Sequence, residues 1–275
     1  MKPKALILTG YGINCEEETA HVFMSTGAQP EIVHVNDLID GSKHMEDYQI
    51  IAIPGGFSYG DDTGAGNAMA NRIYNNFKGK IVKFAQEDKL IIGICNGFQI
   101  LANIGLIPAV DEKYGERQAA LMHNKTARYV CRWVNVKITS EKCIWTKEIT
   151  SLHCPVAHGE GNFYAKDEIL KKLAQNDQIV CKYIKEDGTK ANEEFPFNPN
   201  GAIQDIAGVC DPSGRILGMM PHPERFLAFT NEEGWELKKE KLIRQRRSEM
   251  KSQSLTLPSA GAGLKLFQNA VDYFA

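Results

Sequence analysis

Three features that would assign a sequence to a class at once are missing. No apolar run in the 275 residues approaches the roughly 18 residues of a membrane span, and the N-terminus has no signal-peptide pattern. Neither charge dominates, because 32 basic residues stand against 34 acidic ones and leave a net charge of -2. No general basic field is therefore available for nucleic acid or an anionic membrane. We expect neither as a partner.

Paired cysteines and nucleotide-binding glycines are also missing. The seven cysteines are odd in number and form no CxxC pair, which disfavours a disulfide framework or a structural zinc site. We therefore expect reduced thiols, no metal and a soluble, cytoplasmic protein. No GxxxxGK[ST] loop occurs, and GAGNAM at 64–69 lacks the third glycine of a dinucleotide fingerprint. The sequence thus predicts no ATP and no other cofactor on this chain.

What the sequence does contain is an alternation of apolar runs and helical patterns over its first hundred residues. Strands are predicted at 4–9, 31–35, 49–53 and 90–94, and helices at 16–25, 65–76, 79–88 and 98–104. LIIGI at 90–94 is apolar throughout, as in a parallel strand covered on both faces. Later strands at 129–138, 201–210 and 215–220 are typical of antiparallel pairing. We predict an α/β fold with a mostly parallel, doubly wound sheet, helices on both faces and added antiparallel strands.

No composition break divides the chain, so we expect a single domain over 1–275 that ends in an amphipathic helix at 261–274. Insertions are expected near 184–200, which is rich in loop residues, and near 229–257, which is charged and weakly patterned. The second contains KKEKLIRQRR at 238–247. Because Glu240 interrupts this basic run and most charged helices are merely solvated, we do not interpret it as a nucleic-acid patch.

Cys95 is the best candidate for a nucleophile. It lies between the strand at 90–94 and the following helix, with Gly93 two residues before it and Gly97 two residues after. This spacing is typical of a nucleophile elbow, a strained turn that pushes a side chain above the sheet. A helix N-terminus favours the thiolate, and the N–H of Asn96 could stabilise an oxyanion. The competing interpretation, a buried core cysteine, better fits the cysteines at 131, 143, 154, 181 and 210.

A base for this thiol is offered by MMPHPER at 219–225. Prolines on both sides of His222 exclude a helix and favour an extended backbone. Residues i and i+2 of an extended segment point the same way, so His222 and Glu224 can face one site. The carboxylate would hold one imidazole nitrogen while the other meets the thiol. A solvated pair in a proline-rich turn is the alternative, which the Cys95 elbow disfavours.

A glycine-rich loop, PGGFSYGD at 54–61, follows another predicted parallel strand. Ligands in such sheets bind beyond the carboxyl ends of the strands, so Gly55, Gly56 and Phe57 should border Cys95. Two successive glycines let the backbone approach a ligand and turn an N–H toward negative charge. We expect Gly56 and Asn96 to form an oxyanion hole, although an ordinary strand-to-helix turn would also fit this loop.

Together these segments resemble the class I, triad-type glutamine amidotransferases, whose fold is flavodoxin-like. The resemblance rests on GICNGFQ at 93–99 and HPE at 222–224. It extends to NCE at 14–16, GGFSYGD at 55–61, RYVCRWVNVKI at 128–138 and HGEG at 158–161. Within this family the chain is most similar, over roughly residues 4 to 228 and the final helix, to glutaminase subunits that serve a synthetase of purine synthesis. One departure is Asn162, which stands where related sequences often carry arginine.

The resemblance implies roles for these residues. Cys95 would attack the side-chain amide of glutamine, His222 would pass the proton to departing ammonia, and Glu224 would orient His222. The glutamyl thioester would then be hydrolysed to glutamate. Gln99, together with His158 and Gly159 of HGEG, would shape the glutamine pocket.

The resemblance also implies partners. A large synthetase subunit, with a small bridging subunit, would receive the ammonia and amidate formylglycinamide ribonucleotide. ATP and magnesium would bind to that synthetase. Two alternatives stay open: another class I amidotransferase or cysteine hydrolase of the same fold, or a non-catalytic interaction protein.

Overall fold

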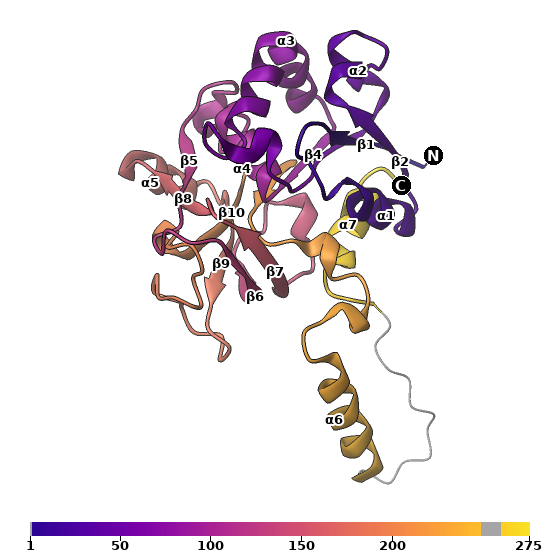
Figure 1. Cartoon of the computed structure of the whole chain (residues 1–275), viewed down its shortest axis with the longest axis vertical. Coiled ribbons are helices and arrows are strands. Elements are labelled where there is room, and N and C mark those ends of the chain that lie inside the picture. Colours follow the sequence, from indigo (N-terminus) through magenta and orange to yellow (C-terminus); the bar gives the residue numbers. More distant parts are fainter. Residues whose placement is uncertain (1, 249–259) are drawn as a thin grey trace.

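The computed structural model describes residues 2–248 and 260–275, and one large mixed sheet organises them (Figure 1). In spatial order its strands are β2 (Gln29–His34), β1 (Lys4–Thr9), β3 (Ile50–Ile53), β4 (Leu90–Ile94), β11 (Ile216–Met219), β10 (Ile206–Cys210), β9 (Ile179–Ile184), β6 (Val130–Ile138) and β7 (Ser151–His158). Neighbours from β2 to β11 pair in parallel, and those from β11 to β7 pair antiparallel. The predicted α/β fold is confirmed.

Helices cover both faces of the parallel strands (Figure 1). The helices of the described residues are α1 (Glu16–Ser25), α2 (Val35–Ile39), α3 (Asn67–Gln86), α4 (Asn96–Asn103), α5 (Asp167–Gln175), α6 (Trp235–Ser248) and α7 (Leu264–Asp272). On one face α1 packs against α7, where the rings of Phe23 and Phe267 meet edge to face at 5.2 Å between centroids. On the other face α3 packs against α4. Both layers leave the carboxyl ends of the central strands accessible for a site.

Close packing at the centre explains the glycines around Cys95. Every residue of β4 is buried, as its unbroken apolar run predicts. A Cβ on Gly97 would lie 1.8 Å from the carbonyl oxygen of Ile53, so α4 can lie directly on the end of β3 only with glycine at this position. A Cβ on Gly93 would lie 2.5 Å from the carbonyl oxygen of Gly97. These two glycines permit the sharp turn from β4 into α4.

Several elements differ from the sequence prediction. The two helices predicted at 65–76 and 79–88 form one helix, α3, with a kink at Phe77. β7, β9 and α5 were not predicted, nor was the small antiparallel pair β5 (Ala119–Met122) and β8 (Asn162–Ala165). β7 contains Pro155, which a strand tolerates at the edge of a sheet, where β7 lies.

The two segments expected to be insertions differ in form. Beyond β9 the chain makes a loop closed by a bridge between Ile184 and Lys190 and by Asp205, which accepts hydrogen bonds from the backbone of Asn192 and Glu193. Helix α6 extends away from the sheet (Figure 1). Residues 249–257 of the second segment lie outside the described residues. No described helix is long and apolar enough to cross a membrane.

Candidate active site

Cys95 lies at the turn between β4 and α4, as the elbow pattern predicts. Its backbone has φ 53° and ψ -105°, a strained conformation for a residue with a side chain, and the residue is 4% exposed. Its N–H donates to the carbonyl oxygen of Met219 at 2.8 Å, which ties the turn to β11. The thiol lies 3.6 Å from the carbonyl oxygen of Ala157, at the end of β7. The sulfur therefore sits where β4, β11 and β7 end.

His222 and Glu224 follow β11 and are both 1% exposed. The backbone N–H of His222 donates to the carbonyl oxygen of Pro155 at 2.8 Å, and its Nδ1–H donates to Glu224 Oε1 at 2.5 Å. Within the described residues, His222 Nε2 has no hydrogen-bond partner and is free to exchange a proton. Burial opposes protonation, but the charges of Glu224 and then Cys95 outweigh it, so the pKa of His222 is raised well above its ordinary value.

Gly55 lies directly against these side chains. A Cβ at this position would be 2.7 Å from His222 Cε1 and 3.5 Å from Cys95 Cβ. Gly56 has φ 151°, and a Cβ there would be 2.5 Å from the carbonyl oxygen of Gly12. Among the described residues, the backbone N–H groups of Gly56 and Asn96 donate no hydrogen bond to the protein. The loop after β3 thus borders Cys95 and leaves two donors without acceptors.

Cys15 is a member of this cluster whose position the sequence did not predict. It is 1% exposed, precedes α1, and its Sγ accepts a hydrogen bond from Arg225 Nη2 at 2.9 Å. One ligand atom from each of Cys15, His222 and Glu224 lies within 4.8 Å of the other two, a spacing that a metal ion could use. However, Glu224 already holds Nδ1 of His222, and the cationic Arg225 occupies the sulfur. These two contacts would compete with an ion for the imidazole and the sulfur.

A cavity of about 520 Å³ opens beside the cluster. Its walls combine two aromatic side chains with charged groups of both signs, and they consist of Phe57, Asp61, His123, Ala127, Arg128, Tyr129, Gly159 and Glu160. The rings of Phe57 and Tyr129 lie 5.9 Å apart. Burial and the charge of Cys95 raise the pKa of Tyr129, which shows how near this wall lies to the sulfur. The cavity suits a small zwitterion.

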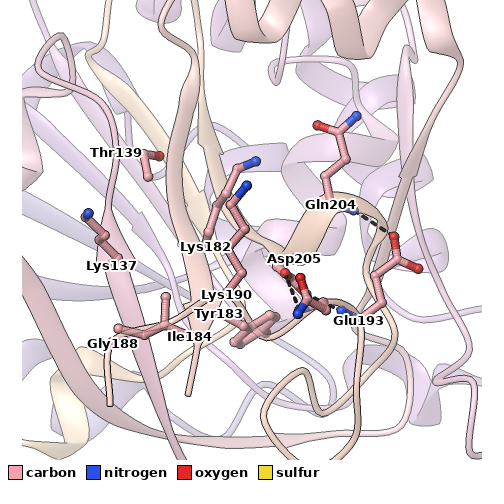
Figure 2. Close-up of a pocket in the computed structure, with 11 residues that line it drawn as sticks. Lys137, Thr139, Lys182, Tyr183, Ile184, Gly188, Lys190, Glu193, Gln204 and Asp205 are labelled. Carbon is pink, nitrogen blue, oxygen red and sulfur yellow. Dashed lines mark hydrogen bonds between the residues drawn. The ribbon is translucent and has the colours of Figure 1, made fainter. Parts of the chain in front are cut away.

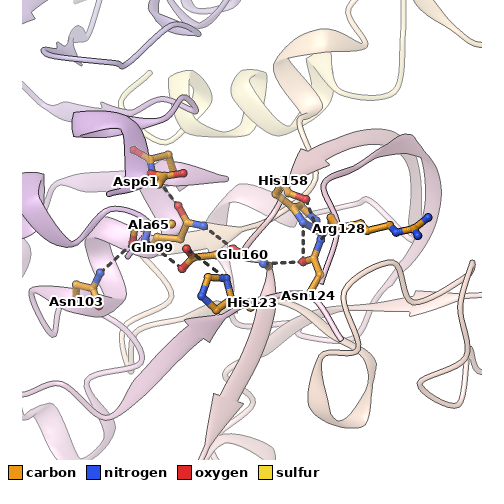
Figure 3. A network of polar contacts seen from close by, with 11 residues as sticks. Asp61, Ala65, Gln99, Asn103, His123, Asn124, Arg128, His158 and Glu160 are labelled. Atoms are coloured by element: carbon orange, nitrogen blue, oxygen red, sulfur yellow. Dashed lines mark hydrogen bonds and ion pairs between the residues drawn. The ribbon is translucent and has the colours of Figure 1, made fainter. Parts of the chain in front are cut away.

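A polar network supports the charged wall of this cavity (Figure 3). Gln99 Nε2 donates to the backbone carbonyl of Glu160, and Gln99 Oε1 accepts from Asn96 Nδ2 at 2.8 Å. Glu160 Oε2 accepts from the backbone N–H of Ala65 at 3.1 Å. Burial, and then repulsion from Glu160, raise the pKa of Asp61 to about 6. Gln99 therefore lies behind the cavity and fixes the carboxylate of Glu160 through its backbone.

His158 also lies behind the cavity rather than in its wall. Its Nδ1 lies 3.2 Å from Asn124 Oδ1 (Figure 3). Its Nε2 lies 3.4 Å from Asn200 Nδ2. Burial and the charge of His222 lower its pKa to about 3, so the ring is neutral, with Nδ1–H as donor and Nε2 as acceptor. With both nitrogens engaged, His158 can shape the pocket only through the loop that carries Gly159.

Two other predictions concern residues outside the cluster. Cys131 was expected to be a core cysteine, and this is wrong: it is exposed, because it lies on the outward-facing side of β6. Cys154 and Cys181 are buried, and burial raises their pKa values far above the ordinary range, which fits inert core thiols. Asn162 is buried at the start of β8 and does not line the cavity.

A larger cavity of about 700 Å³ lies elsewhere, and Figure 2 shows Lys137, Lys182 and Lys190 around it. Lys137 is seven residues along β6 from Val130, which pairs with His158, so the end of the cavity at Lys137 lies roughly 20 Å from His158. None of the candidate site residues lines it. Of these two cavities, the smaller one lies beside Cys95.

Comparison with known proteins identifies the family. Residues 2–274 match the CobB/CobQ-like glutamine amidotransferase domain. The chain is 52% identical to phosphoribosylformylglycinamidine synthase subunit PurQ of Methanococcus maripaludis, over 100% of this chain and 99% of the relative. The chain belongs to the PurQ family. A PurQ subunit of Dehalococcoides mccartyi is 39% identical over 99% of this chain and 98% of its own length. The predicted family is confirmed.

Solved structures agree with this assignment. A chain of PurLQS from Thermotoga maritima is 27% identical, with a TM-score of 0.71 and full coverage of both chains. A glutamine amidotransferase from the same organism is 14% identical, with a TM-score of 0.53, and covers 99% of this chain and 97% of its own. The second likeness supports the fold alone. This chain thus shares its fold, in which Cys95 follows the central strand β4, with that chain of PurLQS.

Proposed function

We propose that this chain is the glutaminase subunit of phosphoribosylformylglycinamidine synthase and that Cys95, His222 and Glu224 are its catalytic residues. The observation that carries the proposal is the convergence of these three side chains beside two backbone N–H groups without acceptors. Support also comes from the full-length similarity to PurQ subunits.

The geometry supports a thioester mechanism. His222 takes the proton of Cys95, and the sulfur attacks the side-chain amide carbon of glutamine. The N–H groups of Gly56 and Asn96 stabilise the negative oxygen that forms. His222 Nε2 then gives its proton to the departing ammonia, and water hydrolyses the thioester to glutamate. Glu224 holds Nδ1–H throughout and stabilises the imidazolium.

The cavity supports glutamine as substrate. The carboxylates of Glu160 and Asp61 provide negative charge for the α-ammonium group, and Arg128 provides positive charge for the α-carboxylate. Phe57 and Tyr129 offer apolar surface to the methylene groups between head and amide. His123 lies 3.5 Å from Glu160 at the rim. Opposite charges at one end and Cys95 at the other match the two ends of glutamine.

Ammonia would pass to a large synthetase subunit that amidates formylglycinamide ribonucleotide with ATP and magnesium. Similarity to a chain of PurLQS supports association with other subunits, of which one would be a small bridging subunit. Seven free cysteines support a cytoplasmic location. Another class I amidotransferase of the same fold is the remaining enzyme candidate, and PurQ relatives of the same length disfavour it.

The decisive experiment compares glutamine and ammonia as nitrogen donors in the complex reconstituted with its synthetase. Cys95→Ala should abolish glutamine-dependent synthesis and leave ammonia-dependent synthesis intact, because only the first uses the sulfur. Cys131→Ala, on an exposed strand position, is the matched control and should retain both activities. Glutamine-dependent synthesis by Cys95→Ala would refute the assignment of the nucleophile. If the rate of glutamine hydrolysis did not change when the synthetase and its substrate were added, another class I amidotransferase of the same fold would be favoured.

A further inference from the structure

Two buried cysteines from distant parts of the chain meet at one imidazole. Cys15 precedes the ten-residue helix α1, and Cys95 precedes the eight-residue helix α4. Both sulfurs interact with His222 and favour its protonated form. The proposed glutaminase mechanism uses only Cys95, so the second thiol beside the same base has no part in it.

Gly55 has no side chain at the point where Cys15, Cys95 and His222 come together. Cys15 Sγ and Cys95 Cβ lie 3.1 and 3.5 Å from the point that a Cβ of Gly55 would occupy. The N–H of Cys15 also donates to the carbonyl oxygen of Gly55 at 3.2 Å, which ties the start of α1 to this loop. Cys15 and Cys95 therefore border the same point, and rotation of the Cys15 side chain can turn its sulfur toward Cys95.

Cys15 lies in surroundings that favour a reactive thiol. Arg225 Nη2 donates to its sulfur at 2.9 Å, and α1 presents the positive end of its dipole. Arg225 is only partly buried, and its Nε lies 3.5 Å from Glu18, which can retain the guanidinium when the sulfur turns away. Cys154 and Cys181, by contrast, are buried among apolar side chains.

We propose that Cys15 and Cys95 form a redox site in which hydrogen peroxide converts the two thiols to a disulfide. Cys95 attacks the peroxide: an S–O bond forms, the O–O bond breaks, and the leaving hydroxide takes a proton to become water. Cys15 then attacks the sulfenic sulfur of Cys95, so that an S–S bond forms, the S–O bond breaks and a second water leaves. Two thiols are oxidised and one peroxide is reduced. His222 accepts and returns the protons.

Such a disulfide would protect the nucleophile as well as block it. A sulfenic acid without a neighbouring thiol proceeds to sulfinic and sulfonic acids, which reductants do not reverse. A disulfide with Cys15 stops the oxidation at a stage that a thiol reductant reverses. The inference goes beyond the glutaminase function, because a covalent link between two peptides is detected whether or not the chain hydrolyses glutamine.

The test treats the reduced, full-length chain with hydrogen peroxide. Peptide mapping by mass spectrometry without reductant should find the peptide of Cys15 joined to that of Cys95. Glutaminase activity of the complex should fall on oxidation and return with dithiothreitol. In Cys15→Ser, the recovered fraction should be about tenfold lower, with Cys95 found as sulfinic or sulfonic acid. Cys131→Ser removes an exposed thiol instead and should behave as the wild type.

Oxidation of Cys95 without a link to Cys15, or a link to any other cysteine, would overturn the proposal. Equal recovery in Cys15→Ser and wild type would do the same. Circular dichroism checks that Cys15→Ser is folded, and Cys15→Ala is the second variant if it is not. If the untreated wild type had no glutaminase activity, only the proposed function would be contradicted. Mass spectrometry would still show whether Cys15 and Cys95 form a disulfide.

Discussion

Gly55→Ala tests whether the glycine loop sets the geometry of the catalytic pair. The new Cβ would lie 2.7 Å from His222 Cε1, whereas carbon atoms in favourable contact are about 3.5–4.0 Å apart. The imidazole would have to move by roughly 1 Å, against its 2.5 Å hydrogen bond to Glu224. A displacement of this size at a reacting group costs about 100-fold in kcat. Unlike Gly56, Gly55 has an ordinary φ, so the effect is steric alone.

The assay is glutamine hydrolysis by the reconstituted complex, with ammonia-dependent synthesis measured on the same preparation. KM for glutamine should change much less than kcat, because the new methyl group lies at the imidazole and not at Glu160 or Arg128. Gly79→Ala is the matched control: it lies in α3 with open space around its Cβ, and it should retain activity and gain about 0.5–1 kcal/mol of stability. Near-normal kcat in a folded Gly55→Ala would refute the reasoning.

Three further predictions concern charge. Glu224→Gln should lower kcat about 1,000-fold and move the alkaline limb of the pH–rate profile to lower pH, because His222 loses the carboxylate that favours its imidazolium. Glu160→Gln should raise KM for glutamine about tenfold and change kcat little, as measured by steady-state kinetics. Because His158 has a folded pKa of about 3 against 6.5 when unfolded, the unfolded chain binds the proton first as pH falls. Because of His158, the unfolding free energy of the wild type should fall by about 2 kcal/mol more between pH 7 and pH 5 than that of His158→Gln. Urea denaturation of both proteins at the two pH values measures this difference.

Local rules were enough to predict the core of the fold and the candidate triad. The run at 90–94 predicts a buried parallel strand, and the glycines around Cys95 predict the turn that follows it. Prolines around His222 predict an extended backbone without a helix, and this is wrong: Pro223–Arg225 form a short 3-10 helix, so His222 Nδ1 and Glu224 Oε1 meet across this turn and not as i and i+2 of an extended segment. β7 did not follow from such rules, because Pro155 and an imperfect alternation hide a strand that only its place at the sheet edge makes acceptable.

Contacts between distant segments set the limit of sequence reasoning at this site. Glu160 and Asp61 lie inside recognised motifs, yet only the folded chain shows that they share one cavity wall through Gln99 and Asn96. Cys15 is 210 residues from Arg225, and its place beside the imidazole depends on how β3 delivers Gly55 between two helix N-termini. The sequence motifs identify Cys95 and Cys15 as members of one family pattern. Only the distances in the folded chain show that Cys15 lies close enough to the proposed nucleophile, Cys95, to react with its oxidised form. A glycine at position 55 is therefore needed for two reasons: a Cβ there would displace His222, and it would also stand against the sulfur of Cys15 beside Cys95.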